Sequence, residues 1–315
     1  MDTTGTLFLP PGGSTIAGEV DALFYFLFYA SLALFAIVLF GIVFLSIRYR
    51  RRKKEVPEPT KGMTHNLKLE LLWSVIPTIL VIIVFFWGFK IYMKMNVVPK
   101  DAMEVKVTGQ KWFWSFDYPE GAKTVNELVV PVGKPVKLLM SSKDVIHSFF
   151  VPDFRIKMDV LPNRYSVTWF EATHVGNYNL FCTEFCGDGH STMIGKVKVV
   201  SEREYAAWLE AGSSGGEGMS LEEYGQKLYV AKACNTCHSI ENKTLVGPAF
   251  NGIFGKTRVF TKGDKLTADE NYIRQSVLEP QAHVVAGFEP VMPTYQGLLG
   301  DREIDAIIAF LKTLK

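Results

Sequence analysis

Two long apolar segments near the start of the chain constrain its fold more than any other feature. Residues 23–47 form an uncharged run of 25 residues, and residues 71–89 form a second uncharged run of 19 residues. An α-helix rises about 1.5 Å per residue, so the first run spans a hydrocarbon core of about 30 Å with some tilt, and the second is near the lower limit. Pro77 is tolerated in a membrane helix whose neighbours satisfy the freed carbonyl. We therefore predict two transmembrane helices in residues 1–99, rather than two buried core helices.

The charges around these runs predict their orientation. Residues 48–54 read Arg-Tyr-Arg-Arg-Arg-Lys-Lys, whereas the segment before the first run contains no Lys or Arg. By the positive-inside rule the loop 48–68 is cytoplasmic, and the N-terminus and everything after the second run lie on the outer side. The first run starts late and lacks a basic leader, so we expect it to stay as an anchor in the prokaryotic cell (inner) membrane rather than to be cleaved as a signal peptide.

The charge balance argues against a nucleic-acid partner. The 315 residues carry a formal net charge of only +2, which does not provide a large basic face. Membrane orientation already explains the single basic cluster. We therefore expect a lipid bilayer, and no nucleic acid, among the partners of the chain.

The hydropathy pattern changes at about residue 100 and again at about residue 219. Residues 100–211 hold short alternating runs separated by turn residues, which is typical of an antiparallel sandwich or barrel. Residues 212–218, rich in Gly and Ser, indicate a flexible linker. Helical periodicity then predicts a small all-α domain over residues 219–315. The runs with strand character are 103–108, 136–140, 165–170 and 196–200, and a short helix at 202–209 closes the first of these two domains.

Helix-start signals and an amphipathic pattern together predict three helices in the last domain. Ser220 with Glu223 forms a capping-box pattern that opens a helix to about Lys232. Thr267 with Glu270 repeats the pattern ahead of a helix over 272–278. Residues 301–314 form an amphipathic final helix, with Ile304, Ile307, Ile308 and Leu311 on one face.

A short loop after residue 181 concentrates soft metal ligands. Two thiols, an imidazole and a thioether lie within twelve residues: Cys182, Cys186, His190 and Met193, with His147 35 residues before Cys182. This set favours copper, because zinc sites use Cys and His without Met. A mononuclear blue-copper centre needs one Cys, so the second thiolate indicates two metal ions with bridging sulfurs. Disulfides are the alternative interpretation of the cysteines.

The pattern C-x-E-x-C-x3-H-x2-M, with its upstream His, resembles the CuA loop of cytochrome c oxidase subunit II at every position. The resemblance implies a cupredoxin-like sandwich. It also implies that Cys182 and Cys186 are bridging thiolates and that His147 and His190 are terminal ligands. Met193 and the carbonyl of Glu184 would be weak axial ligands. In the family the Glu184 side chain would reach a magnesium ion shared with subunit I.

Two further segments resemble the same family. Residues 109–118 match its G-x-x-W-aromatic-W-x-aromatic run, in which the first tryptophan, here Trp112, is exposed and takes part in electron entry. Entry through a fused haem domain is the alternative. Residues 70–77 match E-x-x-W-T-x-x-P with Ser74 in place of Thr, and the resemblance places Glu70 at the inner mouth of a proton path into subunit I. A solvated carboxylate at the membrane boundary is the plainer interpretation.

Residues 234–238, Cys-Asn-Thr-Cys-His, form the C-x-x-C-H pattern of c-type haem attachment. Cys234 and Cys237 would bond to the porphyrin, and His238 would supply one axial ligand. Half a zinc site is the alternative, but the chain has no second C-x-x-C. The candidates for the other axial ligand are Met219 and Met292. We choose Met292, because its position 54 residues after His238 is the arrangement of the cytochrome c family, as is the Gly-Pro loop at 247–248.

The two modules together resemble subunit II of a caa-type haem–copper oxidase. The resemblance implies a proton-translocating oxidoreductase of the translocase class, in which this chain holds no dioxygen-reduction site. Electrons would pass from an external cytochrome c or similar donor through one covalent haem c and the two coppers of CuA to subunit I. The remaining partners would be the other oxidase subunits.

Three other functions stay open at this point. One is a nitric oxide reductase whose small subunit carries CuA. The presence of Glu70 modestly favours an oxidase over this reductase. A second is a quinol oxidase subunit II, which lacks the copper ligands that are complete here. The third is a non-enzymatic, membrane-anchored copper-binding assembly protein, in which a covalent haem has no evident use.

Overall fold

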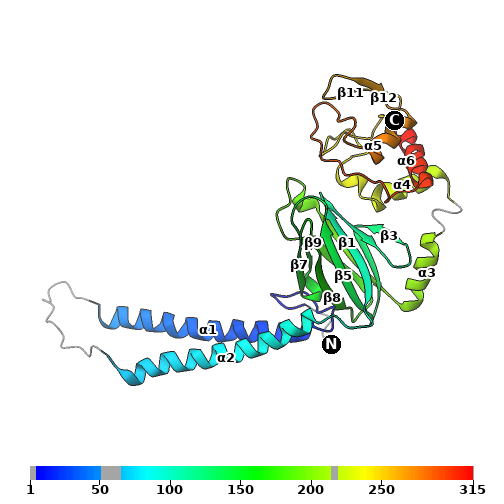
Figure 1. The fold of residues 1–315 in the computed structure, drawn as a ribbon. Coiled ribbons are helices and arrows are strands. Elements are labelled where there is room, and N and C mark those ends of the chain that lie inside the picture. Colours follow the sequence, from blue (N-terminus) through cyan, green and yellow to red (C-terminus); the bar gives the residue numbers. More distant parts are fainter. Residues whose placement is uncertain (1–4, 51–64, 214–218, 315) are drawn as a thin grey trace. The chain divides into compact units, whose positions relative to one another are not determined.

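The computed structural model describes residues 5–50, 65–213 and 219–314 (Figure 1). The chain divides into two compact units, one made of residues 16–97 and the other of residues 98–315 together with the segment before residue 16. Most of the predicted basic loop, residues 51–64, and most of the predicted linker, residues 214–218, lie outside the described residues.

The smaller unit consists of two helices, α1 (Ala17–Arg48) and α2 (Leu67–Asn96). Both are long and apolar enough to cross a membrane, and their most apolar stretches bury no side chain within the protein. They extend beyond the predicted runs, because the helical backbone continues into the polar residues that flank each run. Near the α2 end that leads to the second unit, Lys94 Nζ lies 2.5 Å from Glu19 Oε1 of α1. The prediction of a membrane protein with two spanning helices is confirmed.

The chain after residue 98 first forms a sandwich of two five-stranded sheets. The first sheet contains, in spatial order, β3 (Lys123–Val125), β2 (Phe113–Asp117), β1 (Met103–Gln110), β5 (Pro135–Ser142) and β8 (Ser166–Glu171). The second contains β4 (Glu127–Pro131), β10 (Ile194–Val200), β9 (Gly176–Cys182), β6 (His147–Val151) and β7 (Ile156–Val160). Alternate side chains of β5 are buried, as expected for a strand with one face on the core. The largest fully buried side chains include Trp114, Phe116, Phe149, Phe154 and Phe170.

The sheets are mixed rather than purely antiparallel. β1 pairs with β5 in parallel, and β4 pairs with β10 in parallel, while the other pairs are antiparallel. Neither parallel pair is joined by a hairpin, because the chain visits other strands between its two members, and only a hairpin forces the antiparallel arrangement. The prediction of a β-sandwich is confirmed, and its strand directions are corrected.

The segment before α1 belongs to the sandwich. Ser14 forms an antiparallel bridge with Ala172, just after β8. The Thr15 N–H donates to the Glu171 carbonyl at 3.0 Å. A Cβ at Gly13 would lie 2.9 Å from the rings of Phe154 and Tyr178, so only glycine fits there without a shift. Both ends of the two-helix unit are therefore connected directly to one folded domain.

Helix α3 (Glu202–Ser213) closes the sandwich and is longer than the predicted 202–209. The part after residue 219 contains α4 (Leu221–Ala231), α5 (Glu270–Leu278), α6 (Asp301–Thr313) and a small hairpin of β11 (Thr257–Val259) and β12 (Lys265–Thr267). The predicted apolar face of α6 is buried. Gly225 of α4 packs on Ala306 of α6, since a Cβ at 225 would lie 2.0 Å from the Ala306 carbonyl oxygen.

One predicted helix cap is correct and one is wrong. Ser220 caps α4, accepting the Glu223 N–H at 3.2 Å. Thr267 does not cap α5, because it lies in β12 and pairs with Thr257. Asp269 is the cap instead, and its carboxylate accepts the Tyr272 N–H at 2.8 Å.

Candidate copper and haem sites

The loop between β9 and β10 carries the predicted copper ligands. β9 ends at Cys182, and a 3₁₀ turn at His190–Thr192 leads into β10. Two backbone hydrogen bonds hold the loop against its neighbours: Cys182 N–H to Met193 O at 3.3 Å, and Thr183 N–H to Ser148 O at 3.0 Å. The second bond brings the loop beside β6, whose first residue is His147. Residues far apart in sequence thus meet at one end of the sandwich.

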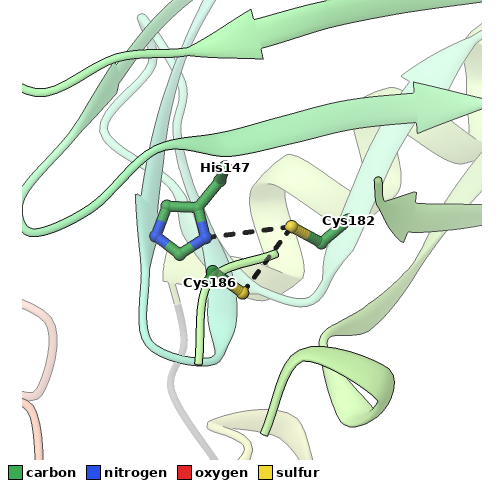
Figure 2. A group of neighbouring side chains, drawn as sticks. All are labelled: His147, Cys182 and Cys186. Atoms are coloured by element: carbon green, nitrogen blue, oxygen red, sulfur yellow. Dashed lines mark hydrogen bonds between the residues drawn. The ribbon is translucent and has the colours of Figure 1, made fainter. Parts of the chain in front are cut away.

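All six predicted ligand groups converge there. Cys182 Sγ lies 3.8 Å from Cys186 Sγ and 3.9 Å from His147 Nδ1 (Figure 2). The Glu184 carbonyl oxygen is 3.3 Å from Cys182 Sγ. Cys186 Sγ lies 3.4 Å from His190 Nδ1 and 3.8 Å from Met193 Sδ. The donors therefore gather around the two sulfurs.

The site is largely shielded from water. His147 and Met193 are fully buried, and Cys182 and Cys186 are buried. Desolvation raises the pKa of Cys186 to about 12, and the neighbouring Cys182 sulfur adds to this rise. Burial also opposes ionisation of Cys182, but its polar contacts, above all with His147, lower its pKa to about 7. The pair titrates as a unit, and full ionisation of both sulfurs requires a positively charged occupant.

Soft sulfur and imidazole donors fit copper. All four cysteines of the chain are free thiols in this structure, so each of them is available as a ligand or as an attachment point. His147 presents Nδ1 to the sulfurs, while its Nε2 lies 2.8 Å from Asp144 Oδ1.

Trp112 lies beneath the copper loop and is only 5% exposed, whereas the family resemblance implied an exposed tryptophan. Its Nε1–H donates to the Cys186 carbonyl at 3.1 Å. A Cβ at Gly189 would lie 2.3 Å from the indole, so the loop closes over the ring only because that residue is glycine. The expectation of exposure is wrong, because the loop covers the indole. The side chain of Glu184, in contrast, is exposed.

Glu70 has a structural role at the start of α2. Its Oε1 accepts the Asn66 N–H at 3.1 Å, and the Asn66 side chain accepts the Leu69 N–H at 3.2 Å. This reciprocal pair satisfies donors that a helix start leaves open. The resemblance to the family had suggested a proton-path role for Glu70 and did not predict this cap.

The haem-attachment residues sit at the end of α4. Ala233 adopts a left-handed conformation, with φ of 60°, and leads into the 3₁₀ turn Cys234–Thr236. His238 is buried, and desolvation lowers its pKa. Its Nδ1 lies 2.8 Å from the Pro248 carbonyl, and the Phe250 ring stacks on it at 4.3 Å. The hydrogen bond to Pro248 assigns the proton to Nδ1 and leaves Nε2 available for a metal.

Met292 lines the same, mostly apolar cavity as Cys234, Cys237 and His238. Met219 lies elsewhere, with its sulfur 3.3 Å from Lys227 Nζ. The geometry therefore favours Met292 over Met219, as the sequence did. His283, which the sequence left without a role, also lines this cavity.

A half-buried arginine fits a bound haem as well. The Nε of Arg258 on β11 is buried and has no hydrogen-bond partner within the described part of the chain. Its charge is close enough to His238 to contribute to the lowered pKa of that ring, after desolvation. A carboxylate, such as a haem propionate, would satisfy this donor. No sequence signal marked Arg258.

We predict that Gly247→Ala disturbs the axial histidine without removing the attachment thiols. A Cβ at 247 would lie 2.5 Å from His238 Cε1, so the ring must move. The haem should stay covalently bound but lose its normal low-spin absorption spectrum. Gly300→Ala is the control, because its Cβ would meet only Glu303 Oε2, at 4.0 Å. A Gly247→Ala spectrum identical to that of the unmodified protein would contradict the placement of His238.

Three family models match the chain in succession. Residues 2–91 match the transmembrane domain of cytochrome c oxidase subunit II, residues 121–200 match its periplasmic domain, and residues 222–315 match cytochrome c. A crystal structure of the periplasmic domain of cytochrome oxidase subunit II from Bradyrhizobium japonicum is 34% identical, with a TM-score of 0.36, and covers 38% of this chain and 98% of that one.

One relative covers most of the chain, and another covers about two thirds of it. Cytochrome c oxidase subunit 2 of Alkalihalophilus pseudofirmus is 32% identical over 294 residues, which cover 90% of this chain and 84% of the relative. Cytochrome c oxidase subunit 2 of Cereibacter sphaeroides is 29% identical over 244 residues, which cover 65% of this chain and 80% of the relative. The ligand loop, the spanning helices and these matches agree: the chain belongs to the cytochrome c oxidase subunit II family and carries a C-terminal cytochrome c module.

Proposed function

We propose that this chain, an electron-transfer subunit of an oxidoreductase complex, passes single electrons from an external donor through a covalent haem c and a binuclear copper centre to the haem–copper subunit I. The observation that supports this route best is the convergence of six donor groups around two sulfurs 3.8 Å apart. The names of the relatives favour this function over nitric oxide reduction or copper assembly.

We assign the copper ligands from the donors that gather around the two sulfurs. Cys182 and Cys186 would supply the thiolates shared by two ions, and His147, His190, Met193 and the Glu184 carbonyl would be the remaining ligands. A single copper ion needs only one thiolate in the blue-copper arrangement, whereas two thiolates with four further donors can serve two ions. When bound, such a pair would supply a one-electron redox centre.

The protein around these ligands keeps the site rigid and dry. The indole of Trp112 donates a hydrogen bond to the Cys186 carbonyl, and this bond holds the ligand loop in place. His147 and Cys182 are buried on the paired strands β6 and β9, which restricts how far these two ligands can move when the charge of the site changes. We also propose that Trp112 takes part in electron entry, through its contact with the ligand loop rather than through an exposed face.

In the cytochrome module, Cys234 and Cys237 would hold the haem through thioether bonds, and His238 Nε2 and Met292 Sδ would be its axial ligands. The Nδ1–H of His238 donates to Pro248, which increases the donor strength of the ring. Met as the second ligand raises the haem potential, which suits an intermediate carrier between a cytochrome c or similar donor and copper.

Two further roles depend on the other oxidase subunits. The exposed Glu184 carboxylate is free to reach out of the copper loop, and we propose that it shares a magnesium ion with subunit I. Glu70 would lie at the entrance of a proton path into subunit I, in addition to capping α2. Both roles rest on the family resemblance.

We propose that the N-terminus and both cofactor domains face the outer side of the cell membrane, with the loop 48–68 cytoplasmic. Two membrane spans return the chain to the side where it began. The bridge between Ser14 and Ala172 supports this independently of charge, because it requires the segment before α1 and the sandwich to share a compartment. The positive-inside rule then assigns that compartment to the outside.

We expect the purified full-length chain, loaded with copper, to hold two copper ions and to show a mixed-valence electron paramagnetic resonance signal. Cys186→Ser should abolish that signal, because one bridge is lost, while the covalent haem remains as an internal control for folding. Metal analysis that finds one copper per chain, or zinc, would overturn the binuclear assignment.

Met292→Ala should leave the haem attached but lower its reduction potential, because the thioether ligand that favours the reduced state is gone. Met219→Ala is the matched control, since its sulfur contacts Lys227 instead. A redox titration in which the Met292→Ala haem keeps its original potential would rule out Met292 as an axial ligand.

The proposed orientation predicts different labelling of two introduced cysteines. Leu7→Cys, at a position that is 90% exposed, should react in intact cells with a maleimide that does not cross membranes. Lys68→Cys should react only after the cells are opened. The unmodified chain gives the background from native thiols, and the reverse labelling pattern would contradict the orientation.

A further inference from the structure

Asp144 occupies the turn between β5 and β6, three residues before the ligand His147. Its side chain lies at the centre of a hydrogen-bond network. Oδ1 accepts the Val145 N–H at 2.7 Å and lies 2.8 Å from His147 Nε2. Oδ2 accepts the Lys111 N–H at 2.8 Å, and the Ser142 hydroxyl lies 3.3 Å from Oδ1. This one carboxylate therefore joins two separate segments of the sandwich.

The first contact acts on the copper ligand itself. With Asp144 as acceptor, the proton of the neutral His147 ring belongs on Nε2, and Nδ1 is left to face the sulfurs. A carboxylate acceptor also increases the donor strength of a ligating imidazole. His147 is fully buried, so water does not compete for this hydrogen bond.

The second contact acts on the support beneath the ligand loop. Lys111, whose N–H binds Asp144, immediately precedes Trp112, and Trp112 donates to the carbonyl of Cys186. The chain of contacts therefore runs from a terminal ligand, through Asp144, to the segment that holds a bridging ligand. Burial alone would raise the pKa of Asp144, but the hydrogen bonds from His147, Lys111 and Val145 outweigh it and lower that pKa.

We propose that Asp144 is a positioning residue of the copper centre, which fixes the tautomer and orientation of His147 and ties it to the Trp112 segment beneath Cys186. This inference rests on the proposed function, because it requires copper at the site. It adds to the six ligands a residue that touches no metal and yet sets how firmly copper is held and how readily it is reduced.

The plainer alternative is that Asp144 only stabilises its turn, through Val145 and Ser142. The two accounts differ in what an amide side chain does. Asparagine keeps an oxygen acceptor for the turn or for His147 but loses the negative charge, and its NH₂ group faces the Lys111 N–H unfavourably. A turn role predicts a copper centre unchanged by Asp144→Asn, whereas a positioning role predicts a changed one.

The test uses the full-length, haem-loaded and copper-loaded chain in detergent, with Asp144→Ala, Asp144→Asn and a control. The control is Asp159→Asn, because Asp159 accepts the Ser148 hydroxyl at 2.7 Å beside the site but contacts no ligand. Three properties are measured: copper retention against a chelator, the copper reduction potential, and the histidine nitrogen couplings in the paramagnetic resonance spectrum. Haem content and circular dichroism report folding separately.

We expect Asp144→Ala to hold copper about 10–100-fold more weakly, as is typical when the outer partner of a ligating histidine is removed. Asp144→Asn should retain more copper, but with a raised reduction potential and altered nitrogen couplings, because the ring becomes a poorer donor. Asp159→Asn should match the unmodified protein. If Asp144→Ala fails to fold, the potential and couplings of Asp144→Asn decide the question.

The inference is overturned if Asp144→Asn keeps the original potential and couplings, or if Asp159→Asn changes them equally. Failure of the proposed function gives a different result. In that case the unmodified chain itself would hold fewer than two coppers, whatever residue occupies position 144, and both ideas would fall together.

Discussion

Two buried sulfurs side by side place the strongest physical demand on the sandwich. Cys182 and Cys186 lie 3.8 Å apart in a site largely shielded from water, where burial and mutual repulsion oppose ionisation of both. The sandwich nevertheless surrounds them with two imidazoles, a thioether and a carbonyl oxygen. The proposed copper ions would offset the cost of ionising both sulfurs, and the strand pairing of β6 with β9 holds His147 and Cys182 in place for them.

The cytochrome module also contains a buried histidine that could bind a metal, but its hydrogen-bond partner is different. Its candidate axial ligand, His238, is buried, and desolvation lowers its pKa, which favours the neutral ring that binds a metal. The Pro248 carbonyl fixes its tautomer as Asp144 fixes that of His147. The proposed haem ligand thus has a neutral acceptor and the proposed copper ligand a charged one. We propose that this difference sets the donor strength separately at the two centres.

Much of this architecture could be predicted from the sequence, because the informative signals are local. Apolar runs identified α1 and α2, the spacing of Cys182, Cys186, His190 and Met193 identified the copper loop, and C-x-x-C-H located the haem module. What the sequence did not predict depends on three-dimensional neighbours. The burial of Trp112 requires Gly189 above it, and the cap of α5 moves to Asp269 because Thr267 is used by a strand. The partners of the ligating histidines, Asp144 and Pro248, are identified only by distance.

The central claim is that electrons move from the haem to the copper pair within one chain, and rapid reduction of the haem tests it most directly. In the full-length, copper-loaded protein, a pulse that reduces haem c should be followed by haem reoxidation in step with the loss of the copper absorption. The rate should not depend on protein concentration, and the process should be absent in Cys186→Ser. A haem that stays reduced in the unmodified protein, while its copper stays oxidised, would contradict the account.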